Sequence, residues 1–566
     1  MIFLLKPLPR WKGLFIHQDR ADRILIARPE AYSIDQSAEA AREWNALLKR
    51  VEILAQGDNA AHGIAGLPAD AAVRGLLRRI HSTYEEAYRF ARMVQTVKPN
   101  RHRFILAAPQ EIRDLFIQQG LPIHRTGSVL AWAGRRLSLL VFALLSLMRH
   151  SLYACMDGRS TDEAVSEARG ILWLGLTPAE LRTEPGALNA LDFIREGPLA
   201  LFQTGAPVYI STPWRNAVSY VDDVKTTLGP HVFRRMPARP FRVRDAWQLI
   251  RDSAQVFMRV IHDMGYRGGL FMPIAPDAAQ LPRMRLWFQR AQPRAVVISN
   301  SMYAYHPLWL AYAPAFGGEA VMIFYSTNSL PFYYQAKPDP LPGDPAYRLL
   351  DCTRFEVWTE GHKRWLMSIG VPEFKLHVAG ILIWGRYKAL REPGRSSKSR
   401  PSPLRIGLFD VIPMRQGFWT IRGVGDLYYD SSRMCRFIRD IVATCRETLA
   451  AQGYELLLKS KRDRMPDHDP EYAALLRDLF DRGELKAVPP GTNPIDAVAA
   501  CDLVLSIPFS SPSVIAAHMK IPTAYYDASY QLRPSPTPIS PEIPVLQNRA
   551  ALTQWMLDSQ RVLCAS

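Results

Sequence analysis

A cluster of hydroxyl groups lies between residues 506 and 513, where the chain reads SIPFSSPS. An apolar run typical of a buried strand precedes it, and Pro512 favours the first turn of a following helix. At a helix N-terminus, serine hydroxyls and free backbone N–H groups can bind a phosphate, and the helix dipole adds attraction. Ser510, Ser511 and Ser513 are therefore candidate phosphate ligands for a nucleotide-linked donor, or else ordinary helix caps.

Three cations follow another apolar run. Lys459, Lys461 and Arg462 lie at the end of residues 454–459, which read as a strand. Cations this close repel one another unless an anion offsets their charge. Arginine suits a bidentate phosphate contact and lysine a point-charge contact. The alternative is a solvated loop in a basic protein.

Three further side chains could accept a proton. Glu360 follows the run 354–359 and Asp410 follows the run 404–409, so both carboxylates are expected at the carboxyl ends of strands. His306 comes shortly after the run 294–300 and could take a proton from an acceptor hydroxyl. We rank them Glu360, His306 and Asp410 as base or positioning residue. Each has an ordinary alternative, since such residues also cap helices or pack.

A group of polar side chains ends the apolar run 320–325. Tyr325, Ser326 and Asn328 stand there with Thr327 between them. Polar groups at the exit of a strand can contact a sugar, and the same residues can form an Asx or Ser/Thr turn.

The elements that position these side chains are predicted from short apolar runs with helical stretches between them. The first series of runs lies at 171–176, 206–212, 294–300, 320–325 and 354–359, and the second at 404–409, 454–459, 486–488, 503–507 and 523–527. Buried strands that alternate with helices predict parallel sheets covered on both faces. The predicted fold class is therefore α/β, with two Rossmann-like doubly wound domains and a mainly helical N-terminal region.

A segment without any hydrophobic residue separates the two series and predicts a linker at 391–403. The predicted division is a helical region at 1–165, a Rossmann-like domain at 166–390, the linker, a second Rossmann-like domain at 404–540 and a helical tail at 541–566. Ligands of open α/β sheets bind beyond the carboxyl ends of the strands, so a cleft between the two domains is expected.

Composition narrows the class of protein. The chain has 566 residues, 48% of them hydrophobic, with a formal charge of +17, which excludes a largely disordered protein. Its six cysteines show neither CxxC pairs nor metal-ligand spacing, so a reducing compartment is expected. The first residues do not predict a secretory signal. The charge suits phosphorylated ligands, and no nucleic-acid-reading motif is present.

The most apolar run is residues 137–147, LSLLVFALLSL. Eleven residues of helix cover about 16 Å, roughly half of the hydrocarbon core, so the run is not expected to cross a bilayer. It reads as a buried core helix or as an interfacial helix. In the second case Arg135, Arg136, Arg149 and His150 would face anionic headgroups.

From about residue 294 to residue 527 the chain resembles bacterial surface-polysaccharide proteins with a GT-B glycosyltransferase layout, and in particular the polysaccharide biosynthesis proteins named for a PFTS motif. The motif stands here as PFSS at residues 508–511, between ACDLVLS at 500–506 and KIPTAYYD at 520–527. VWTEGHKRWLMSIGV at 357–371 and LHVAG at 376–380 resemble the strand–helix–strand unit before the crossover between domains. About 40% of the chain is covered.

The resemblance implies an activated sugar bound mainly to the second domain and an acceptor bound to the first. Ser510, Ser511, Lys459 and Arg462 are the donor-binding positions that it carries over. It implies a cytoplasmic, peripherally membrane-associated glycosyltransferase that uses a CMP- or UDP-sugar and a glycan or lipid-linked acceptor in capsule or O-antigen assembly. No cofactor is expected, and no metal, because fixed cations and a helix N-terminus can stabilise the leaving phosphate. The alternatives are a nucleotide-sugar epimerase of the same fold and a non-catalytic assembly partner.

Overall fold

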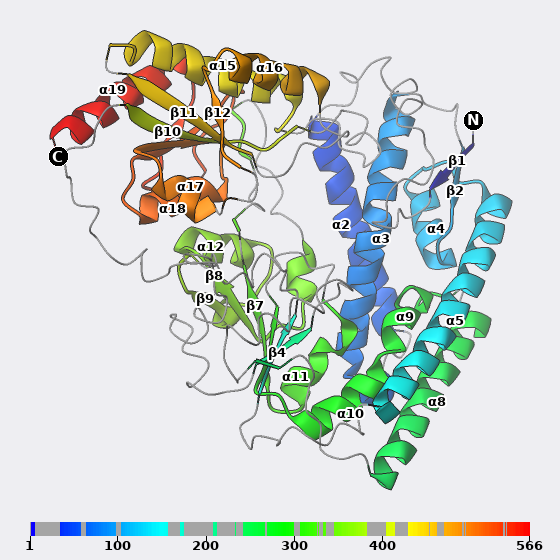
Figure 1. Ribbon diagram of the computed structural model, residues 1–566. Helices are drawn as coiled ribbons and strands as arrows, with labels where there is room; N and C mark the ends of the chain where they lie inside the picture. The colour runs from blue at the N-terminus through cyan, green and yellow to red at the C-terminus, as the bar shows by residue number, and fades with distance from the viewer. Residues whose placement is uncertain are drawn as a thin grey trace.

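The chain forms a helical N-terminal region and two α/β lobes in a computed structural model (Figure 1). The structure describes residues 2–5, 34–57, 64–97, 103–156, 170–174, 208–211, 232–233, 242–266, 269–298, 306–324, 326–327, 332–335, 345–381, 403–413, 428–451, 453–460, 469–489, 492, 494–535, 538 and 540–565. Elements and contacts below refer to these residues.

The N-terminal region is mainly helical, as predicted. Its helices are α2 (Ile34–Gly57), α3 (Ala69–Val97), α4 (Gln110–Gln118) and α5 (Arg125–Met156). The sequence did not predict its small parallel sheet, which pairs β1 (Ile2–Leu5) with β2 (Arg103–Leu106). Apolar side chains recur every three or four residues along α3, and Leu76, Leu77, Ile80 and Tyr84 are fully buried, which explains why this segment is helical.

The first lobe contains a seven-stranded parallel sheet with the strand order β5-β4-β3-β6-β7-β8-β9. The strands are β3 (Ile171–Leu174), β4 (Val208–Ser211), β5 (Val232–Phe233), β6 (Ala295–Ile298), β7 (Glu319–Ile323), β8 (Arg354–Val357) and β9 (Leu376–Val378). The helices are α8 (Val243–Tyr266), α9 (Ala275–Ala278), α10 (Leu281–Ala291), α11 (Tyr312–Ala315) and α12 (Glu360–Ser368). The order reverses direction at β3, as in doubly wound sheets.

The second lobe contains a six-stranded parallel sheet with the order β12-β11-β10-β13-β14-β15. The strands are β10 (Leu404–Phe409), β11 (Tyr454–Lys459), β12 (Lys486–Ala487), β13 (Leu503–Ser506), β14 (Thr523–Tyr526) and β15 (Val545–Leu546). The helices are α15 (Ser431–Thr448), α16 (Pro470–Asp481), α17 (Pro494–Ala499), α18 (Ser511–His518) and α19 (Arg549–Ala565). The two-domain α/β fold class is confirmed. The segment predicted as a helical tail, 541–566, also contributes a strand, β15, to the edge of this sheet.

Short 3₁₀ turns connect several of these elements, at Ile64–Gly66, Met272–Ile274, Leu308–Ala311, Pro345–Leu349 and Glu373–Lys375. In the second lobe, α15, α16 and α19 cover one face of the sheet, and α17 and α18 cover the other (Figure 1). The lobe therefore buries both faces of its strands, which explains their continuous apolar sequences.

One hydrophobic core joins the N-terminal region to the first lobe. Trp44 of α2, Leu77 of α3 and Val297 of β6 belong to the same buried cluster, which reaches Val504 and Ile515 in the second lobe. A second cluster fills the other face of the second sheet, beneath α15 and α19. The helical region is thus packed against the sheet that it precedes.

The apolar run 137–147 lies inside α5, a single helix of 32 residues. The length argument against a membrane span does not hold for the whole helix, because Arg125–Ala154 is long and apolar enough to cross a bilayer by length and composition. The core-helix interpretation is wrong, since only 11% of the most apolar window is buried. Leu137, Phe142 and Met148 are among its exposed side chains.

Candidate functional site

The serine loop, residues 507–511, connects β13 to α18 through a strained turn. Phe509 has a φ of 62°, in the left-handed region that non-glycine residues rarely adopt. Ser510 is the N-cap residue of α18, and its hydroxyl donates a hydrogen bond to the Ile507 carbonyl oxygen at 2.9 Å. Pro512 occupies the first turn of the helix, as predicted. Strain of this kind persists only where the surroundings hold it, and it is common at functional sites.

The hydroxyl of Ser511 connects the two lobes. It accepts a hydrogen bond from the backbone N–H of Thr327 at 3.1 Å and lies 3.3 Å from the Thr327 hydroxyl. Thr327 follows β7 of the first lobe and is buried, whereas Ser511 is half-buried. The two groups of polar residues at strand exits, 184 residues apart in sequence, therefore meet where the lobes face each other.

Ser326 is the other acceptor-side candidate that the structure describes. It is half-buried, and its hydroxyl oxygen is buried without a hydrogen-bond partner among the described residues. Its position beside Thr327 puts it next to the contact with Ser511. Tyr325 and Asn328 lie outside the described residues.

Ser513 lies inside the second lobe, which corrects its prediction as a donor ligand. Its side chain is fully buried. Its hydroxyl lies 2.5 Å from that of Ser506 and donates to the Ala524 carbonyl oxygen at 3.4 Å. These hydrogen bonds connect α18 to β13 and β14. The Ser513 side chain therefore packs against the second sheet and does not lie at the carboxyl edge of its strands.

Lys459 and Asp410 lie beside the serine loop at one edge of the second sheet. The central strand β10 pairs with β11 on one side and β13 on the other, with Phe409 opposite both Lys459 and Ser506. Asp410 follows directly in the chain. The predicted arrangement of a lysine, a carboxylate and a serine loop on the same edge is therefore present. Lys461 and Arg462 lie outside the described residues.

Both of these charged side chains are buried. The Lys459 ammonium donates a hydrogen bond to the Ser460 carbonyl oxygen at 2.9 Å. Asp410 accepts hydrogen bonds from the hydroxyls of Tyr472 and, at 3.4 Å, Ser460. Burial raises the pKa of Asp410 to about 6, although these hydrogen bonds and the charge of Lys459 act in the opposite direction. A carboxyl group with such a pKa is close to the protonation range that suits acid–base work.

Glu360 is the first residue of α12, at the carboxyl end of β8. It is exposed, and α12 lies on the side of the first lobe that faces the second lobe (Figure 1). The preceding residue, Thr359, caps the helix by accepting a hydrogen bond from the backbone N–H of His362 at 3.1 Å. A carboxylate in the first turn is also favourable to the helix dipole. Glu360 is thus accessible without being needed as the cap.

His306 lies elsewhere, and the structure does not support it as a general base. Its ring is buried, with Nδ1 3.8 Å from the Cys352 sulfur, in a cavity of about 30 Å³ that Arg78 and Arg79 of α3 also line. Burial, followed by the charge of Arg78, lowers the pKa of His306 to about 3. The sequence did not reveal that α3 packs against the segment that carries this histidine.

An aromatic cluster beside the serine loop was missed. Phe332 stacks on Tyr428 with ring centroids 4.4 Å apart and lies 5.4 Å from the ring of Phe509. The segment that carries Phe332 belongs in sequence to the first lobe, yet Tyr334 pairs with Leu532 of the second lobe in an antiparallel bridge. A single bridge gives no period in the sequence, so only the run PFYY at 331–334 hinted at it.

The serine loop can be tested through its own conformation. Ser510→Ala should lower the free energy of unfolding by about 1 kcal/mol, because the hydrogen bond that its hydroxyl donates to the Ile507 carbonyl oxygen is lost. Ser510→Thr changes PFSS to the PFTS sequence of the motif and keeps the hydroxyl. It should change the free energy of unfolding by less than about 0.5 kcal/mol. Chemical unfolding of the full chain measures both. Equal losses in the two variants would contradict a role for the hydroxyl.

No group of three or more His, Cys, Asp or Glu side chains placed to hold a metal ion is found within the described parts of the chain. Metal independence therefore stays a prediction. The arrangement at the edge of the second sheet can hold an anion by other means, namely a lysine, serine hydroxyls and the N-terminus of α18.

Comparison with known proteins gives matches to solved structures and to a family. No curated protein matches the chain. Among solved structures, the wall teichoic acid polymerase TagF is 9% identical, and the match covers 76% of this chain and 89% of that chain with a TM-score of 0.38. The lipopolysaccharide outer core galactosyltransferase WaaB is 9% identical, with 70% and 90% covered and a TM-score of 0.32. MurG of Acinetobacter baumannii is 9% identical, with 69% and 84% covered and a TM-score of 0.29.

TM-scores this low carry no conclusion about activity. The family match is a match of sequence, and it includes the second half of the first lobe and nearly all of the second lobe. The family described as polysaccharide biosynthesis PFTS motif protein matches residues 270–556, which is half of the chain, and the protein belongs to this family.

Proposed function

We propose that the protein is a glycosyltransferase that moves a sugar from a CMP- or UDP-sugar to a glycan or lipid-linked acceptor in the assembly of capsule, O-antigen or a related surface polysaccharide. Membership of a polysaccharide biosynthesis family supports the process. The main support for the transfer reaction is the contact of Ser511 with Thr327. It brings the proposed phosphate-binding edge of the second lobe against a polar strand exit of the first lobe.

The donor phosphate is assigned to the second lobe. The N-terminus of α18 offers backbone N–H groups and the hydroxyl of Ser511, and the hydroxyl of Ser510 can join them by releasing the Ile507 carbonyl oxygen. Lys459 lies on a neighbouring strand exit. These groups stabilise the negative charge that develops as the nucleotide leaves. The proposal needs no cofactor apart from the nucleotide sugar, and fixed cations take the role that a metal ion has in other transferases.

The acceptor is assigned to the first lobe. Its hydroxyl attacks the anomeric carbon of the donor, the bond from that carbon to the phosphate oxygen breaks, and a base takes the hydroxyl proton. Glu360 is our candidate for the base, because it is exposed at the start of α12, a helix on the side of the first lobe that faces the second lobe. Asp410 is assigned a positioning role behind Lys459, since its carboxylate is buried and bonded to Tyr472. The cytoplasmic face of the membrane is the expected location.

A donor panel tests the proposal. Isothermal titration with CMP- and UDP-sugars should give binding to at least one, and the bound donor should turn over only when an acceptor is present. Turnover of the donor alone would indicate an epimerase. Failure to bind any member would favour a non-catalytic assembly partner.

Lys459→Ala should weaken binding of that donor by about ten-fold or more, equivalent to about 1.5 kcal/mol, because one charge-assisted phosphate contact is lost. Lys486→Ala is the matched control. It removes an exposed lysine of β12 that pairs with Glu455 at 2.6 Å on the same lobe, and donor affinity should not change. Equal affinity of the Lys459 variant and the unaltered protein would remove this strand exit from the donor site.

A further inference from the structure

Two neighbouring helices, α5 and α8, expose many large apolar side chains on the surface of the protein. Exposed apolar residues occur along α5 from Val129 to Leu152. They include Leu130, Leu137, Val141, Leu145, Met148 and Leu152. Leu130 and Met148 are 68% and 70% exposed, which is unusual for side chains of this size. Arg125 and Arg149 are exposed near the two ends of this stripe.

The second helix, α8, is apolar on two opposite sides. One side packs on the core through Leu249, Val256 and Val260. The other side is exposed and carries Val243, Trp247, Ile250, Phe257, Met258 and Ile261. A surface helix normally keeps polar residues opposite its buried stripe, so a second apolar stripe indicates a second apolar environment.

The two helices run antiparallel, side by side, at the outer edge of the molecule (Figure 1). Ala154 near the end of α5 packs against Leu249 near the start of α8. At the other end, Trp132 and Arg136 of α5 lie against Gly269, just beyond the end of α8. The exposed apolar residues of α5 and α8, which we call the docking face, therefore belong to one packed helix pair.

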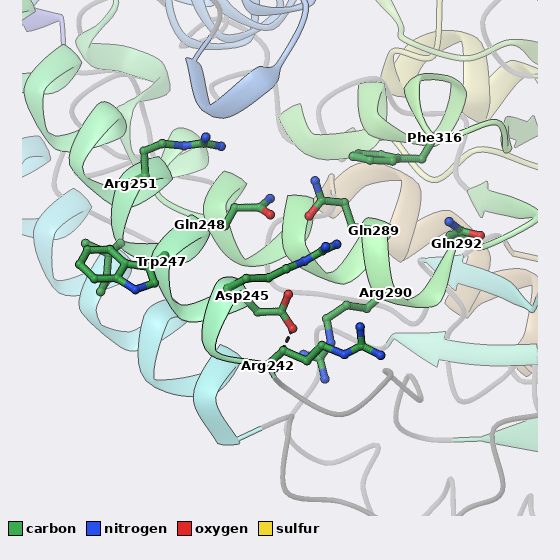
Figure 2. A pocket seen from close by; sticks show the side chains of 11 residues that line it. Arg242, Asp245, Trp247, Gln248, Arg251, Gln289, Arg290, Gln292 and Phe316 are labelled. Atoms are coloured by element: carbon green, nitrogen blue, oxygen red, sulfur yellow. Dashed lines mark hydrogen bonds between the residues drawn. The ribbon is translucent and has the colours of Figure 1, made fainter.

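An arginine-rich pocket adjoins the docking face. It lies between α8 and α10, has a volume of about 850 Å³, and is lined in part by Arg242, Arg244, Arg251, Arg290, Gln248 and Gln289. Figure 2 shows Gln248 and Gln289 pointing toward one another across the pocket. Trp247 and Ile250 line its rim, so the cationic pocket and the apolar stripe share the same helix.

The pocket is strongly positive. Asp245 is the acidic residue among those that line it, and its carboxylate accepts a hydrogen bond from the Arg242 backbone N–H at 2.9 Å. Asp252 lies on the buried side of α8, 3.2 Å from Arg251 and 3.0 Å from Arg285. Four arginines around an open pocket suit phosphate oxygens, which guanidinium groups bind in a bidentate manner.

We propose that the docking face lies in the interfacial layer of a bilayer that contains anionic phospholipid, with a lipid phosphate bound in the arginine pocket. Charge complementarity selects this occupant. Apolar side chains on two helices can enter the acyl boundary, while cations beside them remain at the depth of the headgroups. The inference gives the proposed function a location, and it does not depend on which reaction the protein catalyses.

The helix pair lies along the membrane and does not cross it. One face of α5 packs on the protein through Trp132, Ala143 and Ala154, which are buried. Its neighbours α8 and α10 carry many charged residues, which a spanning bundle would have to place within the hydrocarbon. Only the exposed side of α5 is therefore available to contact lipid, while its other side packs on the protein.

Vesicle flotation of the full chain tests the proposal. The protein should bind vesicles of equal parts phosphatidylglycerol and phosphatidylcholine, bind phosphatidylcholine alone far more weakly, and lose binding as salt is raised. Trp247→Glu with Met258→Glu should reduce binding by about ten-fold or more. Arg244→Gln with Arg251→Gln should reduce it by about 25-fold at low salt, about five-fold for each cation. Asp252 keeps Arg285 as its partner in the second variant.

Matched controls lie on other surfaces. Phe374→Glu with Val562→Glu changes two apolar side chains that are 78% and 62% exposed, and Arg439→Gln with Arg561→Gln changes two exposed arginines. Both control proteins should bind vesicles as the unaltered protein does. A lack of vesicle binding, or equal losses in test and control variants, would overturn the proposal.

Three other outcomes would also overturn it. Retention in membranes after alkaline carbonate extraction would show that α5 spans the bilayer. A dimer that Trp247→Glu dissociates would show that a second copy covers the face. Binding of inorganic phosphate to the pocket by a protein that ignores anionic vesicles would show that the ligand is a free anion.

Discussion

Replacing Asp351 by Ala should lower the free energy of unfolding by about 3–5 kcal/mol. The Asp351 side chain is 2% exposed and accepts hydrogen bonds from Arg74 at 2.7 Å and Arg78 at 2.9 Å, both on α3. Arg78 is itself buried and otherwise donates to the Leu349 carbonyl oxygen at 2.7 Å. Without the carboxylate, a buried guanidinium loses its counter-charge, and the joint between the N-terminal helices and the first lobe is weakened.

The control uses the same arginine. Asp70 also pairs with Arg74, at 2.5 Å, but is 67% exposed. Asp70→Ala should therefore cost no more than about 1 kcal/mol, because exposed ion pairs are screened by water and salt. Denaturant midpoints of the two variants, followed by far-UV circular dichroism, compare them. Similar losses for both would mean that burial does not determine the strength of this pair.

Asp410→Asn should stabilise the protein near pH 7 by about 2–3 kcal/mol and leave it unchanged near pH 4. The folded-state pKa of about 6 exceeds the ordinary value of 3.8, so between these values the folded state binds a proton that the unfolded state lacks. Stability therefore falls as pH rises from about 4 to 6, and above this range the folded protein carries an unfavourable buried charge. The neutral amide removes that dependence while its oxygen still accepts from Tyr472.

Unfolding titrations at several pH values measure the effect, with Asp478→Asn as control. Asp478 is 60% exposed and pairs with Arg482 at 2.6 Å, so its replacement should change stability by less than about 0.5 kcal/mol at every pH. The Asp410 variant should also transfer sugar more slowly if the carboxylate positions Lys459, since stability given up at such a site commonly serves function. A pH profile identical to that of the unaltered protein would contradict the raised pKa.

The candidate site was predicted in outline because its position follows from local patterns. Residues 454–459 and 503–507 are apolar runs that end in polar groups, and parallel strands bring their carboxyl ends to one edge. Lys459, Asp410 and the serine loop accordingly lie together. Glu360 also lies at a strand exit, as predicted, but the same reasoning could not distinguish its exposed position from the buried position of His306.

Two candidates failed for the same physical reason. His306 and Ser513 each occupy a plausible sequence position, but α3 covers the histidine and the second sheet covers the serine. Burial depends on what packs against a residue from elsewhere in the chain, and one sequence carries no direct record of that. The contact between Thr327 and Ser511 is the favourable counterpart, formed by residues that no local pattern relates.

The sequence by itself determined the two series of buried strands, the sheet edge at which their polar exits gather, and the serine loop before a helix, because each follows from periodicity and turn chemistry within a few residues. Only the tertiary structure decided which hydroxyls meet across the lobes and which apolar stripes remain outside. A helix face that packs on a core and one that stays exposed can have the same sequence pattern, so the contacts of α5 and α8 with their neighbours were needed to tell them apart.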